Sequence, residues 1–97
     1  MTHDDVALAL RGLERRLKDD LGVAALYVFG SVARGEAAAG SDVDLLVEFD
    51  RPPTFARFMD LKFLLEDTLG ARVDLVTRRA LRDRLRPRIE AEARRVA

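Results

Sequence analysis

The chain has 97 residues, 48% of them hydrophobic, which suffices for one small core, and we expect a single domain over residues 1–97. Seventeen basic and 17 acidic side chains cancel to zero formal charge, so no overall field draws the chain onto nucleic acid or an anionic membrane. The absence of cysteine excludes disulfides and thiolate metal sites, and a single histidine disfavours histidine-based catalysis.

The amino end predicts one amphipathic helix. Thr2 can cap it, and Gly22 can end it. Its apolar residues recur at helical spacing: Val6, Leu10, Leu13, Leu17 and Leu21. His3 is expected in solvent. No basic region followed by an apolar run opens the chain, and no apolar run is long enough to span a bilayer, so we expect a cytoplasmic protein.

Two strands are predicted next, joined by a turn of small residues. Residues 24–29 form a short apolar run that suits a strand covered on both sides. Residues 30–41 are rich in glycine and alanine and have room for one helical turn. Residues 43–49 alternate, with Val43 and Leu45 on one face and Asp44 and Glu48 on the other.

The second half predicts a helix, a strand and an arginine-rich helical tail. Residues 55–69 have helical periodicity between a capping Thr54 and a closing Gly70, and residues 72–76 form a third strand. The tail from residue 77 is expected to be helical, with Pro87 kinking it or starting a second helix. Its inward residues are expected to be Leu81, Leu85, Ile89 and Ala93 or Val96. This order predicts an α/β (α+β) fold, a small mixed sheet flanked by helices in two or three layers.

The carboxylates suggest a magnesium site. Mg²⁺ prefers oxygen ligands, usually one or two carboxylates with substrate phosphates and water. Asp42 and Asp44 are two residues apart and point to one face, and Asp74 is the best-placed third ligand for a second ion. Glu48 shares the face but lies roughly 13 Å from Asp44, at about 3.3 Å per residue, and is expected to be solvated.

The turn before these carboxylates suits a polyphosphate. Gly30 lets the backbone approach phosphate closely, and Ser31 offers both an amide and a hydroxyl. Arg34 could contact a phosphate bidentately, or it could pair with Glu36 or Asp42. Neither a Walker loop nor a dinucleotide fingerprint is present. The sequence therefore favours a nucleotide triphosphate with its divalent metal.

The pattern Gly-Ser-x-Ala-Arg-Gly-x5-Ser-Asp-x-Asp-Leu, from Gly30 to Leu45, resembles the signature of the minimal nucleotidyltransferases. These are small members of the DNA polymerase β-like superfamily, with a palm-like fold. Residues 73–76, Val-Asp-Leu-Val, are similar to the family's third-carboxylate strand, so the resemblance spans most of the chain. Arg78 and Arg79 follow this strand where the family more often has a lysine.

This resemblance implies a transferase that uses two Mg²⁺ ions to move AMP from ATP to a hydroxyl and release pyrophosphate. Gly30 and Ser31 would hold the β- and γ-phosphates, and Asp42 and Asp44 would ligate the metals. Asp74 would join the second metal and help deprotonate the acceptor. Stand-alone members are often antitoxins that adenylylate (AMPylate) a tyrosine of a HEPN-type ribonuclease toxin, and such a toxin is the implied partner.

Two other functions stay open from the sequence. The chain could be a non-catalytic antitoxin or regulatory subunit that blocks its partner by binding alone. It could also transfer a nucleotide to a small molecule, such as an aminoglycoside, with a separate helical subunit. The arginine-rich tail lacks aromatic residues for base stacking, so we expect no direct nucleic-acid binding and, if the tail binds at all, an acidic protein.

Overall fold

A computed structural model describes residues 1–38, 40–81 and 83–97. Ala39, predicted in the turn, and Arg82, predicted in the helical tail, lie outside the described residues. In chain order the elements are α1 (His3–Leu10), η1 (Arg11–Leu13), α2 (Glu14–Asp19), β1 (Val23–Phe29), α3 (Gly30–Ala33), β2 (Val43–Phe49), α4 (Phe55–Leu69), β3 (Val73–Thr77), η2 (Arg78–Ala80), α5 (Arg86–Glu92) and β4 (Arg94–Arg95), where η denotes a 3₁₀ helix.

The sheet is mixed, with strand order β3-β2-β1-β4. β1 runs antiparallel to β2 and to β4, whereas β2 and β3 are parallel. The parallel pair is connected through α4, which contacts β3. The predicted small mixed sheet flanked by helices is confirmed.

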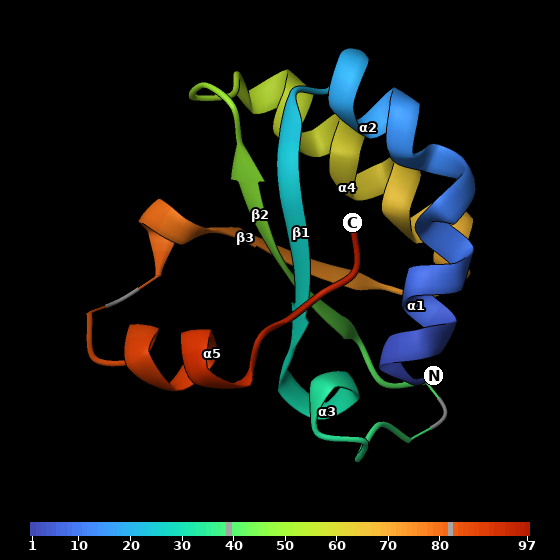
Figure 1. Cartoon of the computed structure of the whole chain (residues 1–97), viewed down its shortest axis with the longest axis vertical. Helices are drawn as coiled ribbons and strands as arrows, with labels where there is room; N and C mark the ends of the chain where they lie inside the picture. The colour runs from blue at the N-terminus through green and yellow to red at the C-terminus, as the bar shows by residue number, and fades with distance from the viewer. Residues whose placement is uncertain (39, 82) are drawn as a thin grey trace.

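The core lies between one face of the sheet and three helices. Figure 1 shows α1, α2 and α4 grouped on one side of the sheet, with α5 apart from them. The core side chains come from those three helices, from α3 and from alternate strand positions: Val6, Leu10, Leu17, Val23, Leu26, Val28, Val32, Val43, Leu45, Val47, Leu61, Leu65, Val73 and Leu75. On the opposite face of β1, Ala25 is buried but Tyr27 and Phe29 are only half-buried, so β1 does not have the full cover on both sides that its apolar run predicts.

The amino-terminal helix begins as predicted but is not continuous. The Thr2 hydroxyl accepts a hydrogen bond from the Asp5 amide, and the Asp5 carboxylate accepts one from the Thr2 amide. The helix then narrows to 3₁₀ geometry over Arg11–Leu13 before α2. Gly12 lies at the centre of this break, and glycine weakens a helix interior.

The carboxyl-terminal tail departs most from its predicted helix. α5 begins next to Pro87, as one of the two predictions for this proline required. After Ala93 the chain is extended, and β4 pairs with β1 through Tyr27–Arg95 and Val28–Arg94. This pairing satisfies backbone groups along a strand edge that would otherwise be open. Leu85, predicted to point inward, is 44% exposed.

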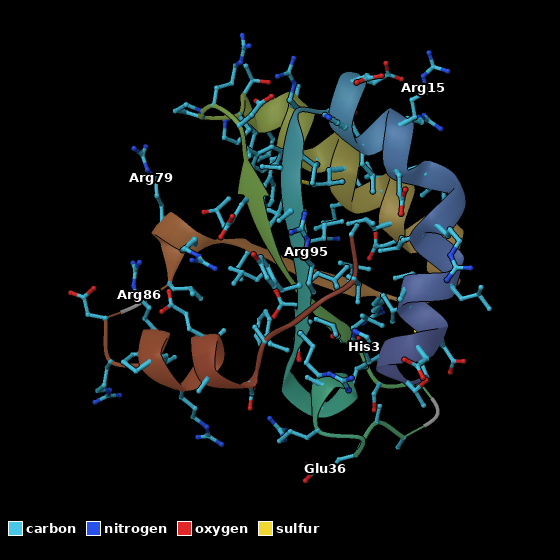
Figure 2. The ribbon with its side chains drawn as sticks, in the orientation of Figure 1. His3, Arg15, Glu36, Arg79, Arg86 and Arg95 are labelled. Carbon is cyan, nitrogen blue, oxygen red and sulfur yellow. The ribbon has the colours of Figure 1, made fainter. Side chains whose placement is uncertain are left out.

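His3 is also placed differently from its prediction. Its Nε2 lies 2.9 Å from the carbonyl oxygen of Arg95, and its side chain is only 18% exposed, so it bridges α1 and β4 instead of pointing into solvent. Arg95 lies over β1 in Figure 2. Among the described helices, none combines the length and the apolar character needed to cross a bilayer.

Candidate active site

Two carboxylates stand side by side on the open face of the sheet. Asp44 of β2 and Asp74 of β3 are register partners in the parallel pair. Their neighbours Val43 and Val73 are buried on the helix-covered face, so strand alternation directs both aspartates to the other face. Asp44 is half-buried and Asp74 is exposed. The predicted placement of Asp74 next to Asp44 therefore agrees with the structure.

Asp42 is exposed and lies just outside β2, immediately before Val43. Its charge reaches Asp44 nevertheless. Burial raises the pKa of the Asp44 carboxyl, and the neighbouring charges of Asp74 and Asp42 raise that pKa further, while Arg34 acts in the opposite direction. Asp74 and Asp42 thus both repel the Asp44 carboxylate, and a cation beside Asp44 would relieve this repulsion.

The chemistry of these donors fits magnesium. All are hard oxygen ligands, and two of them lie on adjacent strands. Within the described residues, no three histidine, cysteine or acidic side chains are gathered closely enough to hold an ion by themselves. The predicted set of three ligands, Asp42, Asp44 and Asp74, is therefore not gathered into one cluster here. Mg²⁺ is usually bound through one or two carboxylates with phosphate oxygens and water. The binding of two ions stays a prediction.

The Gly30 turn lies directly against this group. β1 ends at Phe29, whose register partner is Asp44, so the next residue is carried over the carboxylate. Gly30 has φ +67°, a left-handed conformation that other residues rarely adopt. A Cβ added to Gly30 would collide with Asp44 Oδ2. The position therefore requires glycine for two separate reasons, and the predicted phosphate turn is adjacent to the predicted metal ligands.

Arg34, at the end of α3, is paired with acidic side chains. Its Nε lies 3.0 Å from Glu36 Oε2, which is one of the two pairings left open by the sequence. Its Nη1 lies 3.2 Å from Glu92 Oε2. Hydrogen bonds to Glu36 and then Glu92 raise the pKa of the Arg34 guanidinium, which stays protonated. Ser31 lies on α3 and is half-exposed, whereas the following Val32 is buried.

Glu92 is the residue at this site that sequence reasoning missed. Its Oε1 accepts a hydrogen bond from the Gly30 amide at 2.9 Å, although 62 residues separate the two. The helical pattern of the tail marks its apolar positions and contains no signal for this contact. Only the path of α5, which brings it against α3, places this carboxylate at the turn.

The far end of the open face has a structural role. Glu48 Oε1 lies 2.7 Å from Arg78 Nη2, so Glu48, which was predicted to be solvated, is ion-paired and only 32% exposed. The Arg78 guanidinium also stacks over the Tyr27 ring, 5.7 Å from its centroid, and its Nε lies 3.9 Å from Glu90 Oε1. Arg78 thus joins β1, β2 and α5. Arg79, by contrast, extends outward (Figure 2).

A hollow of about 360 Å³ opens beside this ion pair. Residues 47–53 and 77–79 line it, at the end of β2 and β3 opposite to Asp44 and Asp74. It contains none of the predicted metal or phosphate ligands. The predicted ligands lie instead at the start of β2 and β3, where the Gly30 turn adjoins Asp44 and its register partner Asp74.

A mixed sheet with paired aspartates on adjacent strands, beside a glycine–serine turn, is the arrangement of a nucleotide-transferring enzyme. A model of the protein family described as nucleotidyltransferase domain matches residues 10–97. The chain therefore belongs to the nucleotidyltransferase domain family, and the predicted family is confirmed.

Curated relatives support a narrower group. The protein adenylyltransferase MntA of Thermococcus cleftensis is 40% identical over 82 residues, which is 84% of this chain and 83% of the relative. A protein of Methanocaldococcus jannaschii, provisionally named a protein adenylyltransferase, is 36% identical over 80 residues, which is 82% of this chain and 93% of that protein. The chain is thus similar to small adenylyltransferases over nearly their whole length.

Solved structures agree with the fold. One assigned provisionally as a minimal nucleotidyltransferase superposes with a TM-score of 0.80 at 40% identity, covering 97% of this chain and 95% of that one. A complex of a tri-AMPylated HEPN toxin with its MNT antitoxin from Shewanella oneidensis gives a TM-score of 0.69 at 19% identity, covering 99% of this chain and 72% of that one. The latter likeness is one of fold.

Proposed function

We propose that this nucleotidyltransferase moves AMP from ATP to a hydroxyl on a partner protein, a tyrosine of a HEPN-type ribonuclease toxin, and acts as its antitoxin. The observation that carries the proposal is the contact of the Gly30 turn with Asp44, whose register partner is Asp74. A triphosphate-binding turn, metal ligands and a carboxylate open to solvent meet within one small area. The similarity to protein adenylyltransferases supports the same activity.

Each residue then has a defined task. Gly30 and Ser31 hold the β- and γ-phosphates through amides and a hydroxyl, and Arg34 approaches the same phosphates. Asp42 and Asp44 hold Mg²⁺, with Asp74 joining them. When bound, the metal supplies neutralisation of phosphate charge. Gly30 keeps the backbone close to Asp44, so phosphate and metal ligands are aligned before the nucleotide arrives.

The transfer itself is a displacement at the α-phosphorus. The acceptor hydroxyl oxygen forms a bond to the α-phosphorus of ATP, the bond from that phosphorus to the bridging oxygen breaks, and pyrophosphate leaves. Asp74 takes the hydroxyl proton. Its exposure on β3, at the edge of the sheet, suits this role because the acceptor must enter from outside the chain.

The acceptor is proposed to be a protein because relatives named protein adenylyltransferases resemble this chain over most of its length. The known complex of a tri-AMPylated HEPN toxin with an MNT antitoxin, which shares the fold, motivates the choice of partner. An added adenylyl group would place negative charge where a ribonuclease must bind RNA phosphate, and so would inhibit it.

The test is to incubate the protein with a candidate HEPN toxin, ATP and Mg²⁺ and to measure the toxin by intact mass spectrometry. The expected result is addition of about 329 Da per transferred AMP, on a tyrosine located by peptide mapping. Asp44→Asn should abolish the addition, whereas Asp67→Asn, on the exposed side of α4, should not. Neutralisation of the toxin that survives Asp42→Asn and Asp44→Asn would instead show antitoxin action by binding alone.

A further inference from the structure

We propose that the Glu92 carboxylate is an internal competitor of the nucleotide: it occupies the phosphate-binding turn in the free protein and must leave before ATP binds. The inference rests on the proposed role of Gly30 and Arg34 in holding phosphate. It adds a residue of α5 that sets how tightly the site binds its nucleotide.

The contacts of Glu92 are those that a phosphate would make. Its Oε1 accepts from the Gly30 amide at 2.9 Å, and its two oxygens lie 3.4 and 3.2 Å from Arg34 Nη1. Backbone amides and guanidinium groups bind carboxylate and phosphate oxygens by the same charge-assisted hydrogen bonds. One anion therefore already uses two donors of the proposed cradle, the Gly30 amide and the Arg34 guanidinium.

The element that carries Glu92 can move at low cost. Glu92 is the last residue of α5, a helix of seven residues with no buried residue. An element without buried apolar contacts opens with a small free-energy change. In Figure 1, α5 stands apart from the packed group of α1, α2 and α4.

The segment after Glu92 is anchored independently of it. Val96 and Ala97 exchange backbone hydrogen bonds with Leu26 of β1, and the Arg95 carbonyl contacts His3. Release of Glu92 from the turn therefore leaves the β1–β4 pairing in place. Ala93, where the backbone changes from helical to extended, is the position at which a rotation would withdraw the carboxylate.

Occupation of the turn by Glu92 lowers the apparent affinity for polyphosphate by the fraction of molecules in which the turn is closed. Glu92→Gln tests this because it removes the charge and keeps the size of the side chain. Glu90→Gln is the matched control. Glu90 lies on the same helix, but its Oε1 is 3.9 Å from Arg78 Nε.

The measurement is isothermal titration of the whole chain with inorganic tripolyphosphate without metal, and with Mg-ATP. Glu92→Gln is expected to bind each ligand about three- to tenfold more tightly than the wild type, the size expected for a partly exposed charge-assisted contact. Glu90→Gln is expected to match the wild type. Equal or weaker tripolyphosphate binding by Glu92→Gln, or no binding by either protein, would overturn the inference.

A second readout is the Gly30 amide in a ¹H–¹⁵N spectrum without ligand. Its resonance is expected to shift in Glu92→Gln and to stay in place in Glu90→Gln, and an unchanged resonance in Glu92→Gln contradicts the contact. These results are separate from the proposed function. Wild-type protein that binds tripolyphosphate but transfers no AMP to any HEPN toxin would refute the function and leave the competition by Glu92 intact.

Discussion

Gly30 and Asp44 are in such close contact that no side chain larger than hydrogen fits between them. The contact arises because Phe29, the last residue of β1, is paired in register with Asp44 of β2. The proposed phosphate turn and the proposed metal ligand are therefore positioned by one antiparallel strand pair. Neither can shift without the other.

Gly30→Ala should accordingly lose both stability and nucleotide binding. Gly35→Ala is a matched control, because Gly35 has φ +73° but open space around a Cβ. Strain alone is expected to cost the control about 1 kcal/mol, and the collision with Asp44 should cost Gly30→Ala about 1–3 kcal/mol more. Urea unfolding measures the free energy of unfolding of the two variants. Equal losses in the two variants would show that the close contact does not matter.

Asp44→Asn is expected to stabilise the protein in the absence of metal while abolishing AMP transfer. Burial and the charges of Asp74 and Asp42 raise the pKa of Asp44, so its ionised form opposes folding. That cost is absent below the unfolded pKa of 3.8 and grows as the pH rises through the higher folded pKa. The free energy of unfolding of the variant should therefore exceed that of the wild type at neutral pH and equal it below the unfolded pKa of 3.8.

Mg²⁺ is expected to stabilise the wild type more than Asp44→Asn. An ion that binds only the folded protein raises its stability. Thermal melts with and without millimolar Mg²⁺ are expected to show a larger gain for the wild type than for Asp44→Asn. Equal gains would argue that the metal is held elsewhere.

Asp74→Asn should separate chemistry from binding. Asp74 is exposed on β3, an edge strand, and is proposed to accept the proton of the entering hydroxyl. Loss of a general base typically costs about 10²- to 10⁴-fold in rate. We expect a loss of that order in kcat, with ATP affinity reduced far less. A variant that loses ATP binding and rate together would instead show that Asp74 acts mainly as a metal ligand.

Glu66 links α4 to β3 and should make stability dependent on acid. Its Oε2 accepts a hydrogen bond from the Val73 amide at 3.0 Å and lies 3.4 Å from Lys62 Nζ. The Val73 hydrogen bond, followed by Lys62, lowers the pKa of Glu66. The stabilisation is thus present above the unfolded pKa of 4.5 and is lost as the pH falls through the lower folded pKa.

Glu66→Gln is therefore expected to lower the urea midpoint at pH 7, and the difference from the wild type should disappear as the pH falls through the lowered folded pKa of Glu66. Asp67→Asn is its control, since Asp67 is the exposed neighbour on the same helix. A Glu66→Gln deficit that persists unchanged in acid would assign the effect to packing and not to charge.

The sequence by itself determined the parts of this protein that depend on local pattern. Alternation along residues 43–49 and 72–76 placed Asp44 and Asp74 opposite the core, because successive side chains of a strand point to opposite faces. The spacing from Gly30 to Asp44 also identified the family, because a turn and the strand after it are adjacent along the chain.

Only the tertiary structure decided which distant groups complete the site. The β4 strand, the hydrogen bond from Gly30 to Glu92 and the placement of Arg78 between Glu48 and Glu90 all join segments far apart in the chain. The tail has apolar residues at helical spacing, so its local pattern favours a helix, but the open edge of β1 offers backbone partners that its last residues take instead. Long-range pairing overrides local preference here because unpaired backbone groups are costly and periodicity does not record where their partners lie.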